Sequence, residues 1–432
     1  MNNTEKLIKK EYSIDNSIIE FVNKISNSLK TDFDKYEQIK EYNQIKIIKA
    51  MQKNKLSSTN FSWTTGYGYG DAGRDKTEKI YADIFKTEDA LVRPSISSGT
   101  HALTLALQGI LLPGDDLFSI TGKPYDTLQK VIGIKGDLQG TLKEFGIHYT
   151  DIELENNDIN IEKVLNMIKN DTKMIMIQRS TGYSQRIALT VDQIKNAIFE
   201  IKNKFPNIII MVDNCYGEFT EIDEPSEYGT DITVGSLIKN PGGGIALSGG
   251  YIVGKTDLIK RISNRLTAPG LGKSVGLSYG TTRFTLQGLF LAPQIVVEAI
   301  KGAILFGEIF SMLGYHVFPH KNEKRSDIIL GITFNNPDML IEFCRAIQAA
   351  SAVDSHVTPY PWDMPGYSNQ VIMASGSFID GSSIELSADA PLKEPFSVFY
   401  QGGLSYYQCK LAAMLVLQKF LEKGMIKHLN NL

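Results

Sequence analysis

Residues 208–213 read IIIMVD, five consecutive apolar residues that end in Asp213. An apolar run of this length without polar alternation is typical of a strand buried on both faces of a parallel sheet. A carboxylate at the end of such a strand is costly to bury unless a cation balances it. A helix N-cap would also explain an Asp at this position. The stretch therefore predicts a buried strand whose carboxyl end carries either a functional acid or a helix cap.

The next strand-like stretch downstream ends in a lysine. Residues 233–244 read TVGSLIKNPGGG, and Lys239 is the only charged residue between Val234 and Gly254. Most lysines lie on protein surfaces, whereas this one follows an apolar run and precedes a glycine turn. Burial lowers the pKa of a lysine, which suits an amine that reacts with a carbonyl carbon. We therefore expect a buried, reactive lysine about 26 residues after Asp213.

Upstream of these two segments, strand-like and helical segments alternate from about residue 76 to 255. Such alternation predicts an α/β fold with a mostly parallel, doubly wound sheet. Ligands of these sheets bind beyond the carboxyl ends of the strands. The predicted strands cover residues 90–94, 116–120, 174–178 and 208–212, and the predicted helices cover residues 77–85, 100–109, 126–132 and 191–204.

The two flanks differ from this central region. Residues 17–54 show helical periodicity, and the Gly- and Tyr-rich residues 65–74 are predicted to be a loop, because so many glycines disfavour a regular element. Residues 256–312 are predicted to be helical with a break near 269–272. Beyond residue 313 the pattern predicts a smaller α+β region, with strands near 328–334, 370–374 and 383–387 and helices at 337–350 and 406–423. We therefore expect a helical segment at 1–60, a large domain at 61–305 and a small domain at 306–432.

Two further strand ends carry polar residues that could bind a ligand. Ser98, Gly99 and Thr100 open a predicted helix, where free backbone N–H groups and small hydroxyls can hold a phosphate. The same residues also suit an ordinary capping turn. Tyr125 follows the next predicted strand and could stack on a flat ring, or could be a half-buried turn residue.

Together the four strand ends match the needs of pyridoxal 5′-phosphate. This cofactor requires donors for its phosphate, a face for its ring, a carboxylate for its ring nitrogen and a lysine amine for its aldehyde. Ser98 to Thr100, Tyr125, Asp213 and Lys239 would supply these groups in chain order. The sequence therefore predicts a pyridoxal-phosphate enzyme that carries its cofactor on Lys239 and acts on an amino acid.

Other ligand classes fit the sequence less well. Residues 269–274, PGLGKS, end like a phosphate loop, but Thr267 stands where that motif needs glycine. Residues 242–247 lack the last glycine of a dinucleotide motif, because Leu247 occupies its place. The six histidines and three cysteines are too scattered for a zinc site, so no metal is expected. A non-enzymatic scaffold of the same fold is the remaining alternative, and the presence of both Asp213 and Lys239 argues against it.

Composition is that of an ordinary soluble enzyme. The 432-residue chain is 42% hydrophobic and 22% charged, with a net charge of −3, which gives no reason to expect nucleic acid or an anionic membrane as a partner. Three scattered cysteines suit a reducing compartment. The N-terminus does not resemble a secretory signal, and no stretch reads as the ~20 apolar residues of a membrane span. We expect a cytoplasmic protein.

At this point the motifs resemble a known family, the pyridoxal-phosphate-dependent carbon–sulfur lyases associated with aluminium resistance, which are related to methionine γ-lyase and cystathionine β-lyase. The resemblance extends over about residues 60–410 and implies fold type I, the PLP-dependent transferase-like fold, with a small C-terminal domain. It also implies a homodimer with shared active sites, which could pair into a tetramer. The matching segments are GYGYGDAGRD, SSGTHAL, TGKPYDTL, QRSTGYSQR, VDNCYGEF, GSLIKNPGGGIALSGGYI, RLTAPG, PGYSNQVIMASGSFIDGSS, ELSADAP and YQGGL.

The resemblance implies roles for individual residues. Lys239 matches the lysine that bears the cofactor, Asp213 the partner of the pyridine nitrogen, and Tyr125 the stacking tyrosine. The phosphate would be held by Ser98, Gly99, Thr100 and Ser236, and from the neighbouring subunit by Tyr69 and Arg74. Ser180, with Arg179 and Tyr183, would line the cofactor and substrate side.

The chain departs from the better-known lyases at two positions. Those enzymes carry Arg-Leu-Ser near the C-terminus, where the arginine binds the substrate carboxylate, whereas this chain reads Glu385-Leu386-Ser387. Another cation, such as Arg179, Arg186 or Arg325, would then bind the carboxylate, or the substrate differs. Ile238 replaces a residue that often carries a hydroxyl, which removes one phosphate contact.

The resemblance implies elimination of a thiol from a cystathionine- or methionine-type amino acid. The Lys239 amine would take the Cα proton, and Tyr125 or Tyr69 would supply an acid. An aminotransferase or a racemase would use the same lysine, aspartate and phosphate loop, so these reactions stay open as alternatives.

Overall fold

The computed structural model describes residues 1–137, 139–364, 367 and 369–427. His428 and three residues of the PGYSNQ motif (365, 366 and 368) lie outside the described residues. The chain forms two compact units, Glu41–Pro293 and a second unit that combines Met1–Lys40 with Gln294–Leu432. The three-part division expected from the sequence stays a prediction.

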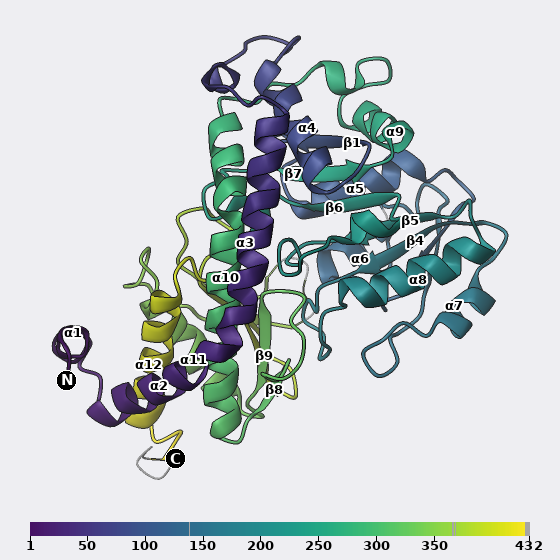
Figure 1. Cartoon of the computed structure of the whole chain (residues 1–432). Helices are drawn as coiled ribbons and strands as arrows, with labels where there is room; N and C mark the ends of the chain where they lie inside the picture. The colour runs from purple at the N-terminus through teal and green to yellow at the C-terminus, as the bar shows by residue number, and fades with distance from the viewer. Residues whose placement is uncertain (138, 365–366, 368, 428–432) are drawn as a thin grey trace. The chain divides into compact units, whose positions relative to one another are not determined.

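A seven-stranded sheet forms the centre of the unit Glu41–Pro293 (Figure 1). Its strand order is β1-β7-β6-β5-β4-β2-β3. The neighbours from β6 to β3 run parallel, whereas β7 is antiparallel to both β6 and β1. The mostly parallel α/β class predicted from the sequence is confirmed. The strands are β1 (Asp89–Arg93), β2 (Asp116–Ser119), β3 (His148–Asp151), β4 (Thr172–Gln178), β5 (Ile209–Asp213), β6 (Ile232–Ser236) and β7 (Gly250–Gly254).

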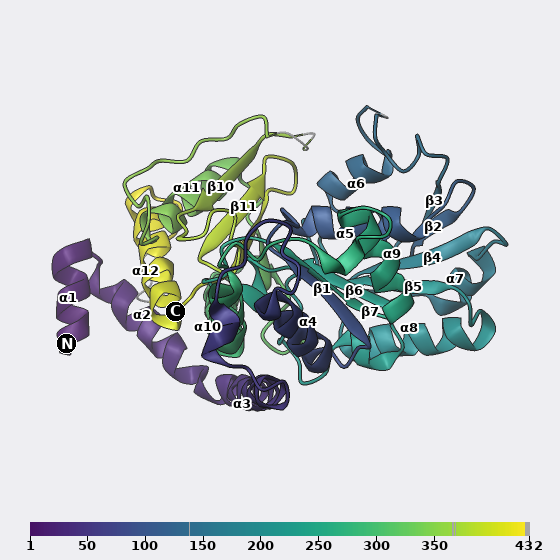
Figure 2. The same ribbon diagram turned by 90° about the horizontal axis from the view of Figure 1, so that it is seen from above.

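Helices cover both faces of this sheet (Figures 1 and 2). One hydrophobic cluster joins α5 and α9 to one sheet face, and a second joins α7 and α8 to the other. Short 3₁₀ helices lie between several of these elements: η1 (Ser58–Phe61), η2 (Pro225–Tyr228), η3 (Asn240–Gly242) and η4 (Gly272–Ser274). The helices that lie wholly in this unit are α4 (Ala72–Ile84), α5 (Gly99–Ile110), α6 (Asp126–Ile132), α7 (Ile161–Met167), α8 (Val191–Lys204) and α9 (Thr256–Leu266).

The alternation of side chains along β4 shows why this sheet is buried on both faces. Met174 and Met176 point into the cluster with α5 and α9, whereas Ile175 and Ile177 point into the cluster with α7 and α8. Successive residues of a strand face opposite sides, so an unbroken apolar run fills two cores at once. Because β2, β4, β5 and β6 run parallel, their C-terminal ends lie on the same side of the sheet, where the polar residues that follow them come together.

The second unit contains a five-stranded antiparallel sheet with the order β10-β11-β12-β9-β8. The helices α11 (Pro337–Ala349) and α12 (Tyr406–Glu422) pack on each other, and α11 packs on the sheet. The smaller α+β unit predicted from the sequence is confirmed. Its strands are β8 (His316–Phe318), β9 (Ile329–Thr333), β10 (Val371–Ser375), β11 (Ser387–Pro391) and β12 (Ser397–Gln401), and its N-terminal helices are α1 (Asn3–Tyr12) and α2 (Asn16–Ser28).

Three predicted elements differ from the structure. The strand expected at 383–387 begins only at Ser387, because residues before it form turns that pair with backbone groups elsewhere. The Gly-rich loop ends earlier than expected, since Asp71 caps the Arg74 N–H at 2.9 Å and α4 starts at Ala72. The antiparallel β7 was not foreseen, because an apolar strand run carries no sign of its direction.

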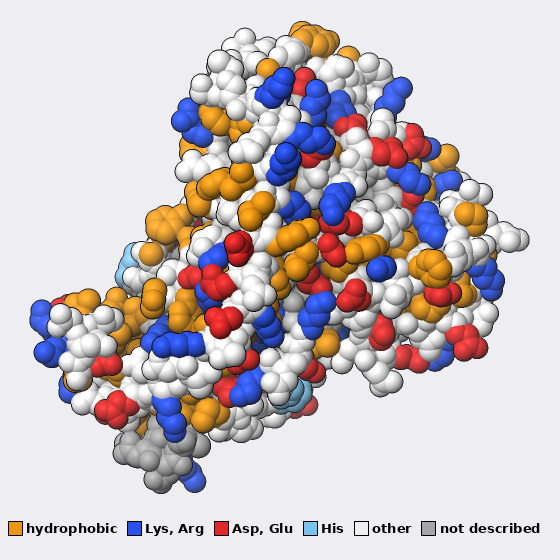
Figure 3. Space-filling model, in the orientation of Figure 1, with side chains coloured by type: hydrophobic (Ala, Val, Ile, Leu, Met, Phe, Trp, Pro, Cys, Tyr) orange, Lys and Arg blue, Asp and Glu red, His pale blue; other side chains and the backbone are white. Residues whose placement is uncertain are grey.

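Two long helices, α3 (Lys30–Lys53) and α10 (Thr282–Met312), each continue from one unit into the other. The expectation that no stretch is apolar enough to span a membrane is wrong for α10, whose most apolar 18-residue window has a mean hydropathy of 1.7. However, 67% of that window is buried within the protein, as in the core helix of a soluble fold. Figure 3 shows basic and acidic side chains interspersed over the face drawn there.

Candidate active site

The carboxyl group of Asp213 lies at the C-terminal end of β5. Its side chain is buried, and Oδ1 accepts the Cys215 backbone N–H at 3.1 Å. Burial raises the pKa of Asp213, and the charge of Lys239 acts in the opposite direction. The carboxyl group therefore turns back over the residues that follow the strand and does not cap a helix.

Lys239 follows β6, the strand that pairs with β5, and reaches the same edge of the sheet. Its side chain is partly buried, and Nζ lies 3.9 Å from the centroid of the Tyr216 ring. A cation above an aromatic face is attracted by the negative potential of the ring. The structure thus places the predicted acid and the predicted lysine close enough for their charges to interact.

The pKa of Lys239 moves in the direction opposite to our expectation. Burial lowers this pKa, but the acidic groups of Cys215, Tyr216, Asp213 and Tyr125 together raise it above its usual value. Burial also raises the pKa of the Cys215 thiol and of the Tyr125 phenol, so both are neutral near pH 7. The prediction of a lowered pKa is therefore wrong for the chain by itself, because the neighbouring acidic groups together outweigh the effect of burial.

The first turn of α5 lies against the end of β6. Ser98 is the N-cap of α5, and its Oγ accepts the His101 N–H at 3.0 Å. A Cβ atom built on Gly99 would lie 3.3 Å from the Ser236 Cβ and 3.4 Å from the Cys215 Sγ. Glycine therefore lets the helix N-terminus approach the strand ends closely, and its free N–H groups lie beside the residues around Ser236.

Tyr125 joins this cluster through its hydroxyl group. The Tyr125 Oη and the Thr100 Oγ1 are 2.8 Å apart, within hydrogen-bonding distance. The Tyr125 backbone N–H donates to the Gln178 Oε1 at 3.1 Å, which ties the start of α6 to the end of β4. The structure therefore brings together Ser98, Gly99, Thr100, Tyr125, Asp213, Ser236 and Lys239. Their roles toward a cofactor stay predictions.

These residues fit pyridoxal 5′-phosphate. The close approach at Gly99 leaves a helix N-terminus with small hydroxyl groups around it, which is the kind of site that binds a phosphate. Asp213 offers a buried carboxylate, Tyr125 an aromatic ring and Lys239 a primary amine, all from neighbouring strand ends. The chemistry of this donor set therefore matches all four parts of the cofactor.

Arg179 lies at the end of β4 and is fully buried. Its guanidinium donates to the Asn214 Oδ1 at 2.8 Å and to the Glu221 Oε1 at 2.9 Å, and it lies 3.6 Å from the Glu224 Oε2. Two carboxylates thus already balance its charge. Its neighbour Ser180 is buried at the same strand end. Arg179 therefore supports the turns beneath the site and is a poor candidate for binding a substrate carboxylate.

Two other arginines are candidates for binding the substrate carboxylate. Arg186 donates to the backbone carbonyls of Gln178 and Ile187 at 2.9 and 3.1 Å, so it tightens the segment after β4. Arg325 belongs to the second unit, where it is buried and donates to the Pro319 carbonyl at 3.2 Å. Burial lowers the pKa of Arg325. The role of each toward a carboxylate stays a prediction.

Tyr69 and Arg74 are not part of the cluster around Lys239 within the described part of the chain. The Tyr69 side chain is 64% exposed and packs edge-on against Tyr67. The Arg74 guanidinium is buried and donates to the carbonyls of Gly68 and Gly276 at 2.8 and 3.0 Å. Arg74 thus shapes the loop that presents Tyr69.

Glu385, which replaces the arginine of the better-known lyases, has a structural role. Its two carboxyl oxygens accept the N–H groups of Phe378 and Ile379, each at 2.9 Å. Burial raises its pKa. A carboxyl group that already accepts two backbone N–H groups cannot bind an anionic substrate group. Glu385 therefore does not take over the role that the arginine has in the better-known lyases.

The structure also shows three residues around Lys239 that sequence reasoning missed. Tyr216 lies under the lysine, Asn240 anchors the turn that carries Tyr216, and Glu218 is buried behind both. Tyr216 adopts a positive φ of 72°, which no local residue preference would suggest for tyrosine. All three stand in or beside quoted motifs, but their roles depend on contacts across the sheet edge.

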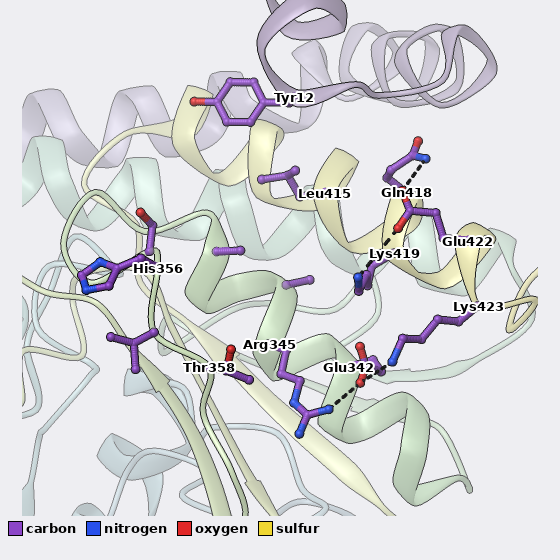
Figure 4. Close-up of a pocket in the computed structure, with 14 residues that line it drawn as sticks. Tyr12, Glu342, Arg345, His356, Thr358, Leu415, Gln418, Lys419, Glu422 and Lys423 are labelled. Carbon is purple, nitrogen blue, oxygen red and sulfur yellow. Dashed lines mark hydrogen bonds and ion pairs between the residues drawn. The ribbon is translucent and has the colours of Figure 1, made fainter.

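A pocket of about 470 Å³ is lined by residues of the second unit (Figure 4). Its charged side chains pair with one another: Glu342 accepts from Arg345 at 2.8 Å and lies 2.7 Å from the Lys423 ammonium. Because Arg345 and Lys423 already bind the Glu342 carboxylate, this carboxylate is not available to a cationic ligand. No group of three or more residues that could hold a metal ion occurs in the described ranges.

Comparisons with known proteins agree with this arrangement. The methionine gamma-lyase family matches residues 18–421. A solved structure of a carbon–sulfur lyase involved in aluminium resistance, from Clostridium novyi NT, is 45% identical, with a TM-score of 0.93 over 97% of this chain and 100% of that chain. A proposed cystathionine beta-lyase involved in aluminium resistance, from Clostridium acetobutylicum, is 43% identical, with a TM-score of 0.94 over 98% of this chain and 99% of that chain.

Curated proteins of similar sequence extend the comparison. The Bacillus subtilis protein YnbB is 46% identical over 392 residues, which are 90% of this chain and 93% of that protein. The L-methionine gamma-lyase of Porphyromonas gingivalis is 27% identical over 46% of this chain and 45% of that enzyme. The family predicted from the quoted motifs is confirmed.

Proposed function

The chain belongs to the methionine gamma-lyase family, whose cofactor is pyridoxal 5′-phosphate, and we propose that it cleaves the carbon–sulfur bond of a sulfur amino acid of the cystathionine or methionine type. One observation carries the proposal: the Lys239 amine and the buried Asp213 carboxyl group follow neighbouring strands, beside the N-terminus of α5, where Gly99 allows a close approach. The similarity to solved carbon–sulfur lyases over nearly the whole chain supports the reaction class.

When bound, the cofactor supplies an electron sink that makes the Cα proton of an amino acid acidic. Lys239 would bear the cofactor and, once released by the incoming amino group, its Nζ would take the Cα proton. Loss of the Cα proton would be followed by cleavage of the carbon–sulfur bond, with both electrons of that bond leaving on sulfur. A proton completes the thiol, and addition of water gives a keto acid and ammonia, so no oxidant is needed.

The chain's own groups set the conditions for this proton transfer. Asp213 lies within electrostatic reach of the Lys239 ammonium and is one of the acidic groups that raise its pKa. A protonated ring nitrogen would replace that cation, so Asp213 would keep its charge partner while the lysine amine is freed to act as a base. The Tyr125 phenol, whose pKa is raised mainly by burial, stays neutral and can donate a hydrogen bond.

We further propose that two copies of the chain share their active sites. Tyr69 is 64% exposed on a loop whose backbone is held by Arg74, so its ring is presented to solvent and available to a neighbouring subunit. In this proposal Tyr69 completes the phosphate site of the partner, Arg74 holds the loop that presents it, and the dimers could pair into tetramers. Three buried free cysteines suit a cytoplasmic protein.

The decisive experiment combines cofactor mapping with product analysis. The purified protein is incubated with pyridoxal phosphate, reduced with borohydride and digested, and the modified peptide is identified. The variant Lys239→Ala should lose the covalent label and about 10²–10⁴-fold or more of the thiol release. The matched control is Lys195→Ala, because the Lys195 Nζ also lies above a tyrosine ring, 4.5 Å from the Tyr228 centroid, but on the surface of α8.

Each result has a clear meaning. Release of thiol plus keto acid from cystathionine or methionine, lost only in Lys239→Ala, supports the lyase. A label on Lys239 with amino-group transfer or racemisation and no thiol would replace the lyase by those reactions. A label on another lysine would refute the site itself.

A further inference from the structure

Glu218 is a fully buried acid that has no part in the reaction proposed above. It stands five residues after Asp213, and its Oε1 accepts the Tyr251 hydroxyl at 2.7 Å. Its Oε2 has no hydrogen-bond partner in the described residues. A buried carboxylate with one free oxygen would be a poorly compensated charge, which proteins avoid. The arrangement therefore fits a neutral carboxylic acid.

The titration behaviour agrees with this geometry. Burial, the largest influence, raises the pKa of Glu218 to about 8, although the Tyr251 hydrogen bond lowers it. Lys239 also lowers this pKa, but it is the smallest of the named influences. The acid is therefore mostly protonated at neutral pH and close to its titration midpoint slightly above it.

The backbone around this acid is shaped to admit it. Gly235 lies opposite Tyr251 in the pairing of β6 with β7. A Cβ atom on Gly235 would lie 2.4 Å from the Tyr251 ring and 2.6 Å from the Glu218 Oε1. Any larger residue would break this contact, and Gly235 directly precedes Ser236 of the predicted phosphate site. The Glu218–Tyr251 pair is thus built into the strand that leads to the site.

A short chain of contacts links Glu218 to Lys239. The Asn240 Nδ2, next to the lysine, donates to the carbonyls of Tyr216 and Glu218 at 2.9 and 3.0 Å. This pair of bonds fixes the turn in which Tyr216 has its positive φ of 72° and carries its ring under the Lys239 Nζ. Displacement of Glu218 would therefore move the surface on which the lysine amine rests.

We propose that Glu218 is a positioning residue of the lysine site: its carboxylic acid, bonded to Tyr251 and fitted against Gly235, anchors the Tyr216–Asn240 turn that lies under the Lys239 amine. The inference rests on the proposed function only in taking Lys239 as the amine that captures the cofactor.

Groups on every neighbouring element bear on this titration. Tyr251 and Tyr81 face Glu218 as neutral phenols, because burial raises the pKa of both. A second ionised acid nearby would disfavour ionisation of Glu218, whereas a nearby cation would favour it. The groups that interact with Glu218 are Tyr251 on β7, Tyr81 on α4, Glu224 on the loop after β5, Cys215 in the same turn and Lys239 after β6.

The first measurement is an infrared difference spectrum of the loaded full-length protein against Glu218→Gln. We expect the C=O band of a protonated carboxyl group below pH 7, lost with a midpoint near pH 8 and absent from the variant. If Glu218→Gln does not fold, Tyr251→Phe serves instead, and removal of the phenol donor should move the midpoint of the same band to higher pH. Absence of the band in the wild-type protein at pH 6 to 7 would overturn the proposal.

The second measurement follows capture of pyridoxal phosphate by Lys239 as a function of pH, with borohydride reduction after a fixed short time and peptide mapping. Wild type and Glu218→Gln, which keeps an acceptor for the Tyr251 hydroxyl, should capture it at the same rate over the whole pH range. Glu218→Ala, which removes that hydrogen bond and frees the turn under Lys239, should capture it more slowly at every pH, by on the order of tenfold. The control Thr233→Val alters another buried side chain of β6, whose hydroxyl has no partner in the described residues, and should follow the wild-type curve.

A Glu218→Ala variant that folds and captures pyridoxal phosphate as fast as wild type would overturn the proposal even if the infrared band is present. No substrate is cleaved in either measurement. Failure of the lyase assay would therefore leave this inference standing, and failure of this inference would leave the lyase standing.

Discussion

Replacement of Arg179 by methionine tests whether this arginine supports the fold or binds substrate. Its side chain is fully buried, and it donates to Asn214, to the Gly217 carbonyl at 2.9 Å and to Glu221. Glu224 lies within 3.6 Å. The variant Arg179→Met keeps much of the apolar volume but leaves two buried carboxyl groups without their cation.

The expected cost follows from this environment. Removal of one partner of a buried ion pair destabilises a protein by about 3–5 kcal/mol, because the remaining charge is uncompensated. For a unit of about 250 residues, each 1 kcal/mol lowers the melting temperature by about 2–4 °C, so we expect a drop on the order of 10 °C. The control is Arg345→Met. The Arg345 side chain is 28% exposed and pairs with Glu342, so its replacement should cost about 1 kcal/mol or less.

The assay compares thermal unfolding of wild type, Arg179→Met and Arg345→Met, followed by steady-state kinetics at a temperature where all three are folded. A large loss of stability with a nearly unchanged KM would support the structural role. If instead Arg179→Met melts within about 2 °C of wild type and raises KM for an amino-acid substrate, Arg179 binds the carboxylate and our reading of its environment is wrong.

Three further predictions concern other buried groups. Because the pKa of Glu218 is raised to about 8 in the folded state, its neutral form stabilises the protein at low pH, and this contribution is lost as pH rises. Glu218→Gln should therefore gain stability relative to wild type by about 1.4 kcal/mol per pH unit between about pH 5 and 8 in urea unfolding. Gly99→Val should weaken cofactor binding by about 1–3 kcal/mol, roughly 5–150-fold in an absorbance titration, because even a Cβ would lie 3.3 Å from Ser236. Glu385→Ala should cost about 1–3 kcal/mol by thermal unfolding, because two backbone N–H groups lose the acceptor that holds their turn; an unchanged melting temperature would contradict this role.

The sequence predicted the central fold well because apolar runs and helical periods report burial directly. The helix Val191–Lys204 has the predicted bounds, and its capping box of Thr190 and Gln193 explains why the start was clear. Strand direction was not predictable in the same way. The apolar runs of β5 and β7 look alike, yet β7 is antiparallel because its chain returns after a turn and not through a helix.

The candidate site was predictable where one residue stands out against its surroundings. Lys239 in an uncharged stretch and Asp213 after an apolar run carry such a contrast. Tyr216 and Glu218 do not, because their importance comes from a positive φ and from a hydroxyl on another strand. The pKa of Lys239 was mispredicted for the same reason: burial can be read along the chain, whereas the neighbours that outweigh it cannot.

The turn after β5 therefore carries two buried acids that meet different requirements. Asp213 accepts a backbone N–H, and among the groups that oppose the effect of burial on its pKa the charge of Lys239 is the largest. Glu218 binds a neutral phenol, and Lys239 is the weakest of the named influences on its pKa. The charge of Lys239 thus ranks higher among the influences on the Asp213 pKa than among those on the Glu218 pKa. Two carboxyl groups five residues apart can then hold opposite protonation states, one ionised to balance a cation and one neutral to support the turn between them.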